Sequence, residues 1–430
     1  MLEKLFKLSH FGTTPKTEIL AGITTYLTMA YIIFVNPAML ADAGMDKGAV
    51  FVATCLAAAI GCFIMGLWAN LPIALAPGMG LNAFFTYGVV LGMGHEWQTA
   101  LGAVFLSGII FLLLSLFKVR EMIINAIPNT LKLAIAAGIG AFLALIALKS
   151  SGIIVDHPAT LVGLGDLTSL APAMSLIGFF AIIAAVQRNI PGAVMLVVLG
   201  ITVIGLLVGD VSYGGIVSAP PSIAPTFMQM DIAAALDVAM LSVIFAFLFV
   251  DLFDTSGTLI AVTQRAGIAE KDGSVPNLGK ALVADSSATI VGAALGTSST
   301  TSYIESASGV AAGGRTGLTA VTVGVLFVLS MFFSPLAGMI PVYATAGAIL
   351  YVSVLMMFTL KDVKWDDLTE AAPVVVVLLL TPLTFSIAHG ITLGFITYAA
   401  AKALGGKASE VSTSVWIVSG LLLAKIIFIG

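Results

Sequence analysis

Four carboxylates lie in the second half of the chain, within stretches otherwise apolar enough to be buried in a lipid bilayer. They are Asp251, Asp254, Asp285 and Glu305. An ionisable side chain near the centre of a bilayer costs roughly 3 kcal/mol or more unless it faces a partner or a water-filled cavity. In such a cavity a carboxylate can accept hydrogen bonds from a ligand or carry a proton. We therefore expect the functional site at these residues.

Two of the acids are spaced for one helix face. Asp251, Asp254 and Thr255 stand at positions i, i+3 and i+4, which brings their side chains together on a helix. Interhelical hydrogen bonding is the structural alternative, but two aspartates are too costly in a membrane for that purpose alone. We predict that Asp251 and Thr255 bind a ligand and that Asp254 transfers protons.

The other two acids have different surroundings. Glu305 follows the polar run 298–303 and is expected in the first turn of a helix, where the helix dipole stabilises a carboxylate. Helix capping is its alternative role, but shorter residues usually cap, so we predict that Glu305 binds ligand and takes part in proton coupling. Asp285 lies near the start of a span, as a proton-handling group or as a solvated carboxylate at the interface.

Each half of the chain contains one short, interrupted span that must position these polar residues. The two segments are Leu71–Tyr87 and Gly296–Gly314. Pro77-Gly78 stops a helix or starts a new one, and the Ser/Thr-rich start of the second segment favours extended backbone. We expect helical halves from about Gly78 and about Ile304. Paired broken segments at membrane depth are the best sequence indication of a transport site.

The first broken segment also carries an amide beside aromatic rings. Asn82 offers hydrogen-bond donors and acceptors, and Phe84 and Phe85 offer ring faces. A planar ligand could bond to the amide and stack on a ring. We therefore include Asn82 and Phe84 among the predicted substrate-binding residues.

The elements around these residues are expected to be membrane helices. The chain has 430 residues, of which 59% are hydrophobic and 9% charged, and its mean hydropathy is +1.12, far outside the range of soluble domains. Long apolar runs with little alternation favour helices over an outer-membrane barrel. About fourteen segments approach or reach the ~20 residues of a spanning helix. The predicted fold is all-α and polytopic.

The basic residues predict the orientation. With the N-terminus on the cytoplasmic side, most Lys and Arg fall in cytoplasmic loops, while Lys47 and Lys149 lie outside. The short N-terminal segment lacks a signal-peptide cleavage site, so the first span is expected to be retained. The cytoplasmic set comprises Lys4, Lys7, Lys16, Lys118, Arg120, Arg188, Arg265, Lys271, Lys280, Arg315, Lys361, Lys364, Lys402 and Lys407.

Other reactive residues predict no further site. Cys55 and Cys62 are about two helical turns apart in one apolar run, too far for a disulfide. The four histidines have no metal-ligand spacing, so we expect no metal and no cofactor besides a coupling proton. The glycine-rich segment Gly309–Gly317 lacks the ending of a phosphate-binding loop and is expected to be a tight turn.

The two halves show a faint internal likeness. Pro128 opens a long Ala/Gly/Leu-rich run in the first half and Pro341 opens one in the second, and a polar loop and short apolar segments follow each. Such likeness is typical of repeats with inverted topology. The second half ends with apolar stretches at 372–388, 389–404 and 412–428, one more than the repeat needs. Either 372–404 is a re-entrant pair, or the last stretch lies outside the repeat.

Four long motifs occur in order at Gly22–Pro37, Asn70–Phe85, Phe249–Thr258 and Gly296–Gly309. They resemble the nucleobase-ascorbate transporter (NCS2) family, and within it the AzgA-like purine permeases of the azaguanine-resistance type. The resemblance covers essentially the whole chain. It implies fourteen spans in two inverted seven-span repeats. It also implies a core domain of residues 1–118 and 233–336 and a gate domain of residues 119–232 and 337–430.

The resemblance also implies roles for individual residues. Asp251 and Glu305 match the paired acids that hold the base in this family, and Asn82 matches the asparagine of span 3. Thr28 matches a polar residue of span 1 near the pocket. Asp285 matches a further acid that the family uses.

Together, the residues and the resemblance predict a proton-coupled secondary active importer of purine nucleobases in the inner membrane, and not an enzyme. Several acids, with no obvious Lys or Arg in the core, favour a neutral ligand rich in N–H groups over an inorganic anion. We favour adenine because an aspartate at position 251 resembles the adenine-type pattern.

Three alternatives stay open at this stage. The first is a guanine or hypoxanthine symporter, and the second is a transporter of another nucleobase or an organic anion. The third is an intramembrane aspartyl hydrolase, which lacks support because no Gly-x-Gly-Asp signature surrounds any of the acids. The expected partners are a purine base, the lipid bilayer and, from the fold, a second copy in a homodimer; no nucleic acid is expected.

Overall fold

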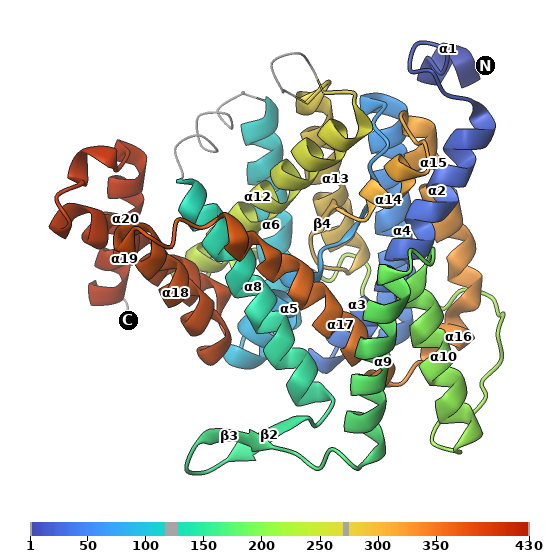
Figure 1. Cartoon of the computed structure of the whole chain (residues 1–430), viewed down its shortest axis with the longest axis horizontal. Helices are drawn as coiled ribbons and strands as arrows, with labels where there is room; N and C mark the ends of the chain where they lie inside the picture. The colour runs from blue at the N-terminus through green and yellow to red at the C-terminus, as the bar shows by residue number, and fades with distance from the viewer. Residues whose placement is uncertain (1, 117–127, 270–274, 429–430) are drawn as a thin grey trace.

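The computed structural model describes residues 2–116, 128–269 and 275–428, and it is mostly helical (Figure 1). The expected basic residues Lys118, Arg120 and Lys271 lie outside the described residues. The elements of the first half are α1 (Leu2–Phe6), α2 (Pro15–Met29), α3 (Ile32–Asp42), α4 (Lys47–Ile64), η1 (Met65–Ala69), β1 (Leu75–Pro77), α5 (Met79–Ala83), η2 (Phe84–Gly92), α6 (Trp97–Leu116), α8 (Asn129–Ser150), β2 (Ile154–His157), β3 (Leu161–Leu164), α9 (Leu170–Gln187) and α10 (Ala193–Leu207).

The second half also consists of long helices and has one short strand among the described residues, whereas the first half has three. Its elements are α11 (Ile232–Ala235), η3 (Val238–Met240), α12 (Leu241–Ala266), α13 (Leu278–Leu295), β4 (Thr300–Ser302), α14 (Ser306–Ala311), α15 (Gly317–Ser330), η4 (Met331–Phe333), α16 (Ser334–Met339), α17 (Val342–Met357), η5 (Phe358–Asp362), α18 (Leu368–Leu383), α19 (Ile387–Leu404), η6 (Ala408–Glu410) and α20 (Thr413–Phe428).

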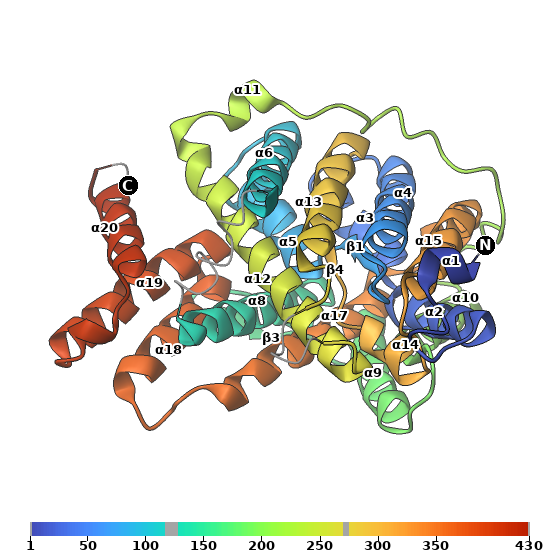
Figure 2. The ribbon, with the colours of Figure 1, turned by 90° about the horizontal axis from the view of Figure 1, so that it is seen from above.

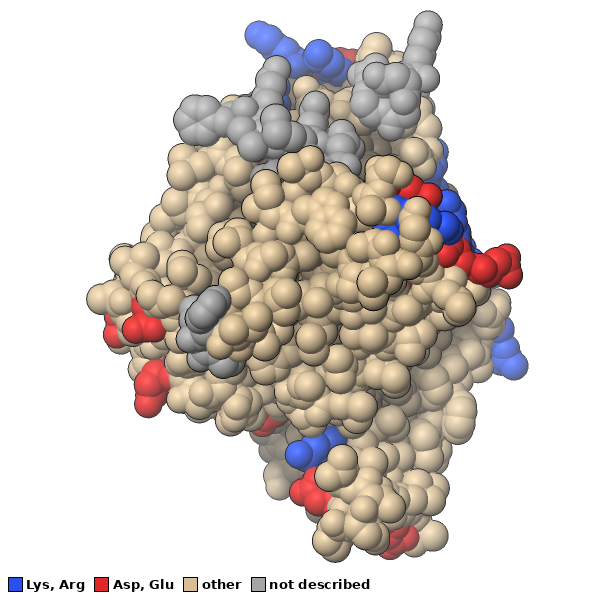
Figure 3. All heavy atoms as spheres, turned by 90° about the vertical axis from the view of Figure 1, so that its left-hand side faces the viewer, with Lys and Arg blue, Asp and Glu red and all other residues tan. Residues whose placement is uncertain are grey.

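Ten helical segments among the described residues are long and apolar enough to cross a membrane, and four shorter apolar helices accompany them. This composition confirms the all-α polytopic class. Figure 3 shows a face whose middle is almost free of Lys, Arg, Asp and Glu, as expected of a surface that contacts lipid. The six-residue helix α14 is too short to span the membrane by itself. The long helices alone therefore do not give the number of membrane crossings, because the broken segments contribute to it.

Contacts between helices reveal the inverted repeat. Pro128 precedes α8 and Pro341 precedes α17, as the sequence likeness predicts. Helix α8 packs against α18, the next α-helix after α17. In turn, α17 packs against α9, the next described α-helix after α8. Four further long helices behave in the same way. Helix α2 of the first half packs against α15 of the second, and α12 of the second half packs against α6 of the first. Equivalent positions of the two halves therefore make equivalent contacts.

The helices form two groups. Helices α2 to α6 pack with α12 to α15, and helices α8 to α10 pack with α17 to α19. Figures 1 and 2 show α18 to α20 on the opposite side of the molecule from α2 and α15. The division of these groups into a core domain and a gate domain, and their motion as separate bodies, stay predictions.

The three apolar stretches at the end of the chain are three separate helices. The first two correspond to α18 and α19, which pack closely against each other. They occupy the places that α9 and α10 hold in the first half, because α18 contacts α8 as α9 contacts α17. Helix α20 contacts α19 and has no counterpart among the described residues of the first half. The second of the two expected arrangements is therefore correct.

Candidate functional site

The two broken segments meet as a short antiparallel pair of strands. Leu75 lies opposite Ser302 and Pro77 lies opposite Thr300. The Gly78 amide adds a hydrogen bond of 2.9 Å to the Ser299 carbonyl. Proline lacks the backbone N–H of a helical residue and clashes with the preceding turn, and Ser and Thr favour extended backbone. Both segments are therefore extended at these residues. This confirms that each segment is half extended and half helical.

The helical halves begin where the sequence indicates. Helix α5 starts at Met79 and α14 at Ser306, close to the expected Gly78 and Ile304. Helix α14 lies tightly against α2, because a Cβ added at Gly309 would come within 2.0 Å of Thr25 Oγ1. Only glycine allows this approach. The close packing fixes the residues at the start of α14 next to the middle of α2.

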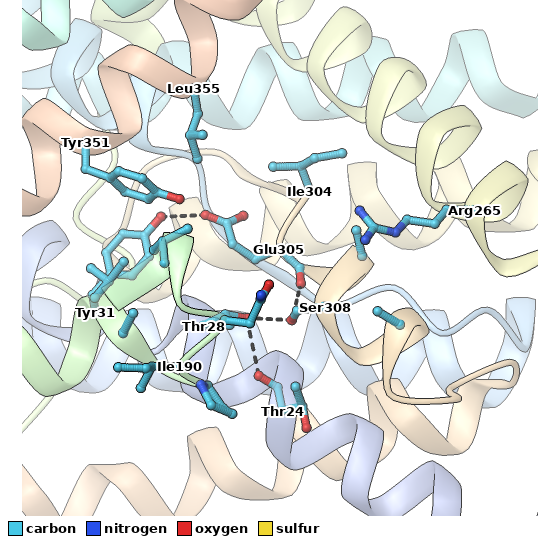
Figure 4. A pocket seen from close by; sticks show the side chains of 17 residues that line it. Thr24, Thr28, Tyr31, Ile190, Arg265, Ile304, Glu305, Ser308, Tyr351 and Leu355 are labelled. Atoms are coloured by element: carbon cyan, nitrogen blue, oxygen red, sulfur yellow. Dashed lines mark hydrogen bonds between the residues drawn. The ribbon is translucent and has the colours of Figure 1, made fainter. Parts of the chain in front are cut away.

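A cavity of about 510 Å³ lies at this junction, between α2, α14 and the helices of the second group (Figure 4). This volume is in the usual range for small-molecule sites. Its wall is largely apolar, with a few polar groups from both halves of the chain. The lining residues are Thr24, Thr28, Tyr31, Val186, Asn189, Ile190, Pro191, Ala193, Val194, Arg265, Ile304, Glu305, Ala307, Ser308, Ala311, Tyr351 and Leu355.

Glu305 is the carboxylate of this cavity. It is half-buried at the N-cap position of α14, but its side chain makes no capping hydrogen bond. Instead, Glu305 Oε1 accepts a hydrogen bond of 2.7 Å from the Tyr31 hydroxyl, and Figure 4 shows Tyr351 on the same side. The second carboxylate oxygen is available to a ligand. Its side chain therefore does not cap α14, and its role in ligand binding stays a prediction.

Thr28 also lines the cavity, as the resemblance implies. Its hydroxyl oxygen lies 2.9 Å from that of Ser308 on α14. Both hydroxyls are within reach of backbone carbonyls, since Thr28 donates to Thr25 and Ser308 donates to Glu305, each over 2.7 Å. Their lone pairs can therefore accept hydrogen bonds from a ligand with N–H groups.

The four acids fall into two pairs. Asp254 is exposed, and it is close enough to Glu305 for the two charges to interact. Asp251 and Asp285 are buried, with 1% and 0% of their surface exposed, and their charges interact with each other. We call Asp254 and Glu305 the outer pair, and Asp251 and Asp285 the inner pair. Asp285 is therefore not a solvated carboxylate at the interface.

The inner pair is held by hydroxyl groups of α13 and β4. Thr289 Oγ1 donates to Asp251 Oδ2 over 3.1 Å, and Ser302 Oγ donates to Asp285 Oδ1 over 3.0 Å. The remaining oxygens, Asp251 Oδ1 and Asp285 Oδ2, are buried and have no hydrogen-bond partner among the described residues. Neither acid lines the cavity that contains Glu305.

Three further predicted binding residues also lie behind the cavity wall. The Thr255 hydroxyl is 2.7 Å from that of Thr301 in β4. Asn82 is fully buried, with Nδ2 3.5 Å from the Pro77 carbonyl and Oδ1 without a partner among the described residues. Phe84 packs against Phe247, with ring centroids 5.0 Å apart. The structure thus brings Glu305 and Thr28 into the cavity and places Asp251, Thr255, Asn82 and Phe84 around the strand pair.

Sequence reasoning missed several residues that line the cavity, among them Tyr31, Tyr351 and Arg265. Tyr31 stands three positions after Thr28 in the same span, so helical spacing could have identified it. Tyr351 comes from α17, whose few polar residues have no spacing that singles it out. Arg265 corrects the expectation that the core has no cation near the site. It is exposed at the end of α12 and faces the cavity in Figure 4.

No group of three or more His, Cys, Asp or Glu side chains suited to a metal ion occurs in the described part of the chain. The cavity instead combines a carboxylate, two tyrosine hydroxyls, an arginine and apolar walls. Such a set can bind a small molecule through hydrogen bonds and apolar contact. It contains no activated nucleophile of the kind that covalent catalysis needs.

Comparisons with known proteins agree with this architecture. Residues 16–393 match the model of the Permease family (Xan_ur_permease). The chain is 51% identical to the adenine permease AdeP of Escherichia coli, covering 100% of this chain and 96% of that protein. It is 46% identical to the guanine/hypoxanthine permease PbuG of Bacillus subtilis, covering 99% of each.

Solved structures reveal the same fold at low sequence identity. The transmembrane domain of a cyanobacterial bicarbonate transporter, BicA, superposes with a TM-score of 0.65 at 18% identity, covering 87% of this chain and 96% of that one. At this identity, the similarity between the two structures shows a shared inverted-repeat fold and nothing about the substrate. The family match and the close relatives agree over nearly the entire length, and the chain belongs to the permeases of the NCS2 family, in its AzgA-like purine permease branch.

Proposed function

We propose that this protein is a proton-coupled importer of purine nucleobases, with adenine as the preferred substrate. The observation that carries the proposal is the Glu305 carboxylate, positioned by Tyr31 in a largely apolar cavity of about 510 Å³. Relatives that cover nearly the whole chain are named as adenine or guanine/hypoxanthine permeases, which supports a purine as the substrate.

The cavity supplies acceptors that a purine needs. Glu305 can accept hydrogen bonds from ring N–H and amino groups, and the hydroxyls of Thr28 and Ser308 can accept further ones. Asp254 does not line the cavity, and its charge acts on Glu305. Tyr351 contributes an aromatic face from the second group of helices. Because Asp251 is buried apart from the cavity, we assign it to the support of the site and not to direct contact with the base. Asn82, Phe84 and Thr255 support the strand pair in the same way.

Alternating access follows from the two groups of helices. Arg265 and the loop at Asn189–Pro191 line the cavity on the side where the positive-inside rule places the cytoplasm. With the N-terminus cytoplasmic, this cavity opens inward in a protein of the inner membrane. A second cavity, of about 630 Å³, lies toward Lys149 and Asp42, which the same orientation places outside. Rocking of the groups would connect the site to each side in turn.

Arg265 bears on the alternative of an anionic substrate. A guanidinium attracts anions, whereas the outer pair of carboxylates repels them, and Glu305 is less exposed than Arg265. Purine binding is therefore favoured over transport of an inorganic or organic anion. Competition with anions decides between these substrates directly.

The test is uptake of radiolabelled adenine into cells that lack their own purine permeases. Unlabelled adenine, guanine, hypoxanthine, xanthine, uracil and sulfate compete in parallel, with and without a protonophore. We expect inhibition by purines and loss of uptake with the protonophore. Uptake blocked by uracil or sulfate but not by purines would overturn the substrate, and uptake insensitive to the protonophore would overturn the coupling.

Two matched variants connect this uptake to the site. Glu305→Gln keeps the side-chain volume but removes the negative charge, and we expect uptake to fall by at least tenfold, since hydrogen bonds to charged groups contribute about 1.5–3 kcal/mol. Glu96→Gln, at an exposed glutamate before α6, is the control and should transport normally. The homodimer stays a prediction, and the mass of the protein in detergent checks it.

A further inference from the structure

Two opposite charges line the cavity without pairing. Glu305 and Arg265 are both among the lining residues, yet no ion pair joins them, and Arg265 forms none with any other residue that the structure describes. A neutral base at Glu305 needs hydrogen bonds but no full positive charge, whereas a guanidinium matches carboxylate and phosphate groups through two parallel hydrogen bonds. Binding of the base alone therefore leaves the charge of Arg265 without a function.

We propose that the cavity also binds a purine nucleoside 5′-monophosphate from the cytoplasmic side, with the base at Glu305 and the phosphate at Arg265, and that the bound nucleotide inhibits transport. The proposal rests on the purine transport proposed above, because base and nucleotide would share the same acceptors. It adds to that function a regulation of the site by a phosphorylated form of its own substrate.

The two charged groups lie at different places in the cavity. In Figure 4, Tyr31 and Tyr351 lie on one side of Glu305, and Arg265 lies on the other side. Glu305 is at the start of α14, and Arg265 is in the last turn of α12. A ligand that reaches both groups must have neutral N–H donors at one end and an anion at the other. A purine nucleotide has this distribution of groups.

The cavity is large enough for such a ligand. Its volume is about 510 Å³. Cavities of roughly 300–1,000 Å³ bury drug-sized ligands, whereas a purine base has only about ten non-hydrogen atoms. The base therefore leaves room for a sugar and a phosphate. Thr24 and Asn189 also line the cavity, and their hydroxyl and amide groups can form hydrogen bonds with the hydroxyls of a sugar.

The order of exposure favours this direction of binding. Arg265 is exposed and Glu305 is half-buried, so the phosphate would stay close to water while the base reaches the carboxylate. The sugar separates the two negative charges, and their repulsion decreases with distance and with screening by water. A free inorganic anion would gain the contact with Arg265 but none of the contacts with the base.

A bound nucleotide would block the change between inward and outward access. The cavity is lined by α2 and α14 of the first group of helices and by Val194 of α10 and Tyr351 of α17 of the second. Closure around a base requires these groups to approach each other on the side of Arg265. A sugar phosphate held there fills the space between them. The nucleotide is therefore an inhibitor and not a substrate.

The experiment measures displacement of radiolabelled adenine from the purified protein in detergent. The competitors are adenosine 5′-monophosphate, adenosine, ribose 5-phosphate, inorganic phosphate and unlabelled adenine. We expect the monophosphate to displace adenine at a concentration at least tenfold lower than adenosine does, because a charge-assisted bond to phosphate is among the stronger hydrogen bonds. Ribose 5-phosphate and inorganic phosphate, which lack the base, should displace little at the same concentrations.

Three variants locate the phosphate. Arg265→Gln removes the charge and should abolish the advantage of the monophosphate over adenosine, with both values expressed relative to unlabelled adenine in the same variant. Arg265→Lys keeps a charge without the planar fork and should retain part of the advantage. Arg188→Gln makes the same change at an exposed arginine after α9 that does not line the cavity, and it should keep the full advantage.

Membrane vesicles of the two orientations test the side of binding. The monophosphate does not cross the membrane, so it should inhibit adenine transport when added to inverted vesicles, whose cytoplasmic face is outside, and not when added to right-side-out vesicles. Inhibition in right-side-out vesicles alone, or equally in both, would overturn binding from the cytoplasm.

The remaining outcomes separate this proposal from the proposed function. A monophosphate no stronger than adenosine in the wild type, or an advantage that persists in Arg265→Gln, would overturn the nucleotide site. Equal loss in Arg188→Gln would indicate a general effect of surface charge and would overturn it as well, as would displacement by inorganic phosphate as strong as that by the monophosphate. If the wild type neither binds nor transports a labelled purine, the proposed function itself fails.

Discussion

The Tyr31 hydroxyl donates a hydrogen bond of 2.7 Å to Glu305 across 274 positions of sequence. Tyr31 stands where the first span is interrupted, between the end of α2 at Met29 and the start of α3 at Ile32. Glu305 stands at the start of α14 in the other half. The contact therefore joins the irregular points of the two repeats, and the position of the carboxylate depends on both.

Replacing Tyr31 by Phe is expected to impair transport while leaving the protein folded. The variant removes the hydroxyl that orients Glu305 and keeps the ring. A hydrogen bond to a charged group contributes about 1.5–3 kcal/mol, so Vmax/KM for purine uptake should fall by about tenfold or more. Uptake kinetics at a series of adenine concentrations measure this change.

Tyr26→Phe is the matched control for this variant. Tyr26 is on α2 in the same first span, its hydroxyl lies 2.5 Å from that of Ser330, and it does not line the cavity. The same chemical change at this position should leave KM unaltered. Equal losses in the two variants would indicate a general effect on the helix and would contradict the role assigned to Tyr31.

Gly309→Ala is expected to destabilise the site by forcing α14 away from α2. The added Cβ would lie 2.0 Å from Thr25 Oγ1 and 2.6 Å from the Ala21 carbonyl oxygen. Overpacking of this kind costs about 1–3 kcal/mol, and it displaces the helix that begins at Glu305. We expect lower thermal stability in detergent and little purine uptake.

A second glycine provides the comparison. A Cβ added at Gly200, inside α10, would meet no atom within 4 Å, and alanine favours helix by about 1 kcal/mol over glycine. Gly200→Ala should therefore be at least as stable as wild type. Adding Thr25→Ala to Gly309→Ala should restore only part of the loss, because the Ala21 carbonyl stays in place; complete recovery would locate the clash in the side chain alone.

The sequence allows the broken segments to be predicted because their cause is local. Pro77 and the Ser/Thr residues of β4 exclude regular helix by their own chemistry. The inverted repeat then predicts that the two broken segments lie opposite each other. The same reasoning explains why Glu305 could be identified, since it stands at the first turn after the extended run.

The division of the acids into two pairs could not be predicted. Asp251 and Asp254 are separated by about 60° around α12, so spacing alone places them on one face. Packing decides between them, because Thr289 of α13 and strand β4 lie against α12 at Asp251 while Asp254 stays exposed. Such tertiary contacts depend on residues far away in the chain. For the same reason Arg265 could be taken for a loop residue although it lines the cavity.

Lys402 is expected to be essential for the stability of the second group of helices. It is 1% exposed and makes ion pairs of 2.6 Å with both Glu370 and Glu410, and Glu370 also accepts a hydrogen bond from Thr130 on α8. Lys402→Met leaves Glu370 with an uncompensated buried charge, which costs about 3 kcal/mol or more. A clear fall in melting temperature in detergent is the expected result.

Lys407→Met provides the reference for this loss. Lys407 pairs with Asp367 over 2.6 Å, but 40% of its side chain is exposed. Exposed ion pairs contribute about 1 kcal/mol or less, so this variant should melt within a few degrees of wild type. A larger fall for Lys407→Met than for Lys402→Met would contradict the ranking by burial.

Acid should weaken the same ion-pair group. Hydrogen bonds from Lys407 and Thr369 lower the pKa of Asp367, and Lys402 lowers the pKa of Glu410. A carboxyl group whose pKa is lowered in the folded state stabilises the fold above its unfolded pKa, about 4, and that contribution is lost as the pH falls. Melting temperatures measured from pH 7 down to pH 3 should therefore decrease, and less steeply in Lys407→Met.

Glu18 is expected to hold the first span against α15. It is fully buried, and its carboxylate accepts hydrogen bonds from the amides of Arg315 and Thr316 at 2.9 Å and 3.2 Å and from the Thr319 hydroxyl at 2.6 Å. Glu18→Ala leaves the Arg315 and Thr316 amides without this acceptor, while the Thr319 hydroxyl can still donate to the Glu18 backbone carbonyl, and each unsatisfied buried donor costs about 1–3 kcal/mol. We expect poor folding, measured by the yield of monodisperse protein.

Glu18→Gln distinguishes the hydrogen bonds from the charge. The amide oxygen of Gln can still accept from one or two donors, so this variant should fold with reduced melting temperature and transport purines. Glu3→Ala, whose carboxylate accepts from the Ser9 amide in the exposed N-terminal segment, should behave as wild type. Because the Glu18 carboxylate joins α2 of one repeat to α15 of the other, normal folding of Glu18→Ala would mean that apolar packing alone holds these helices together.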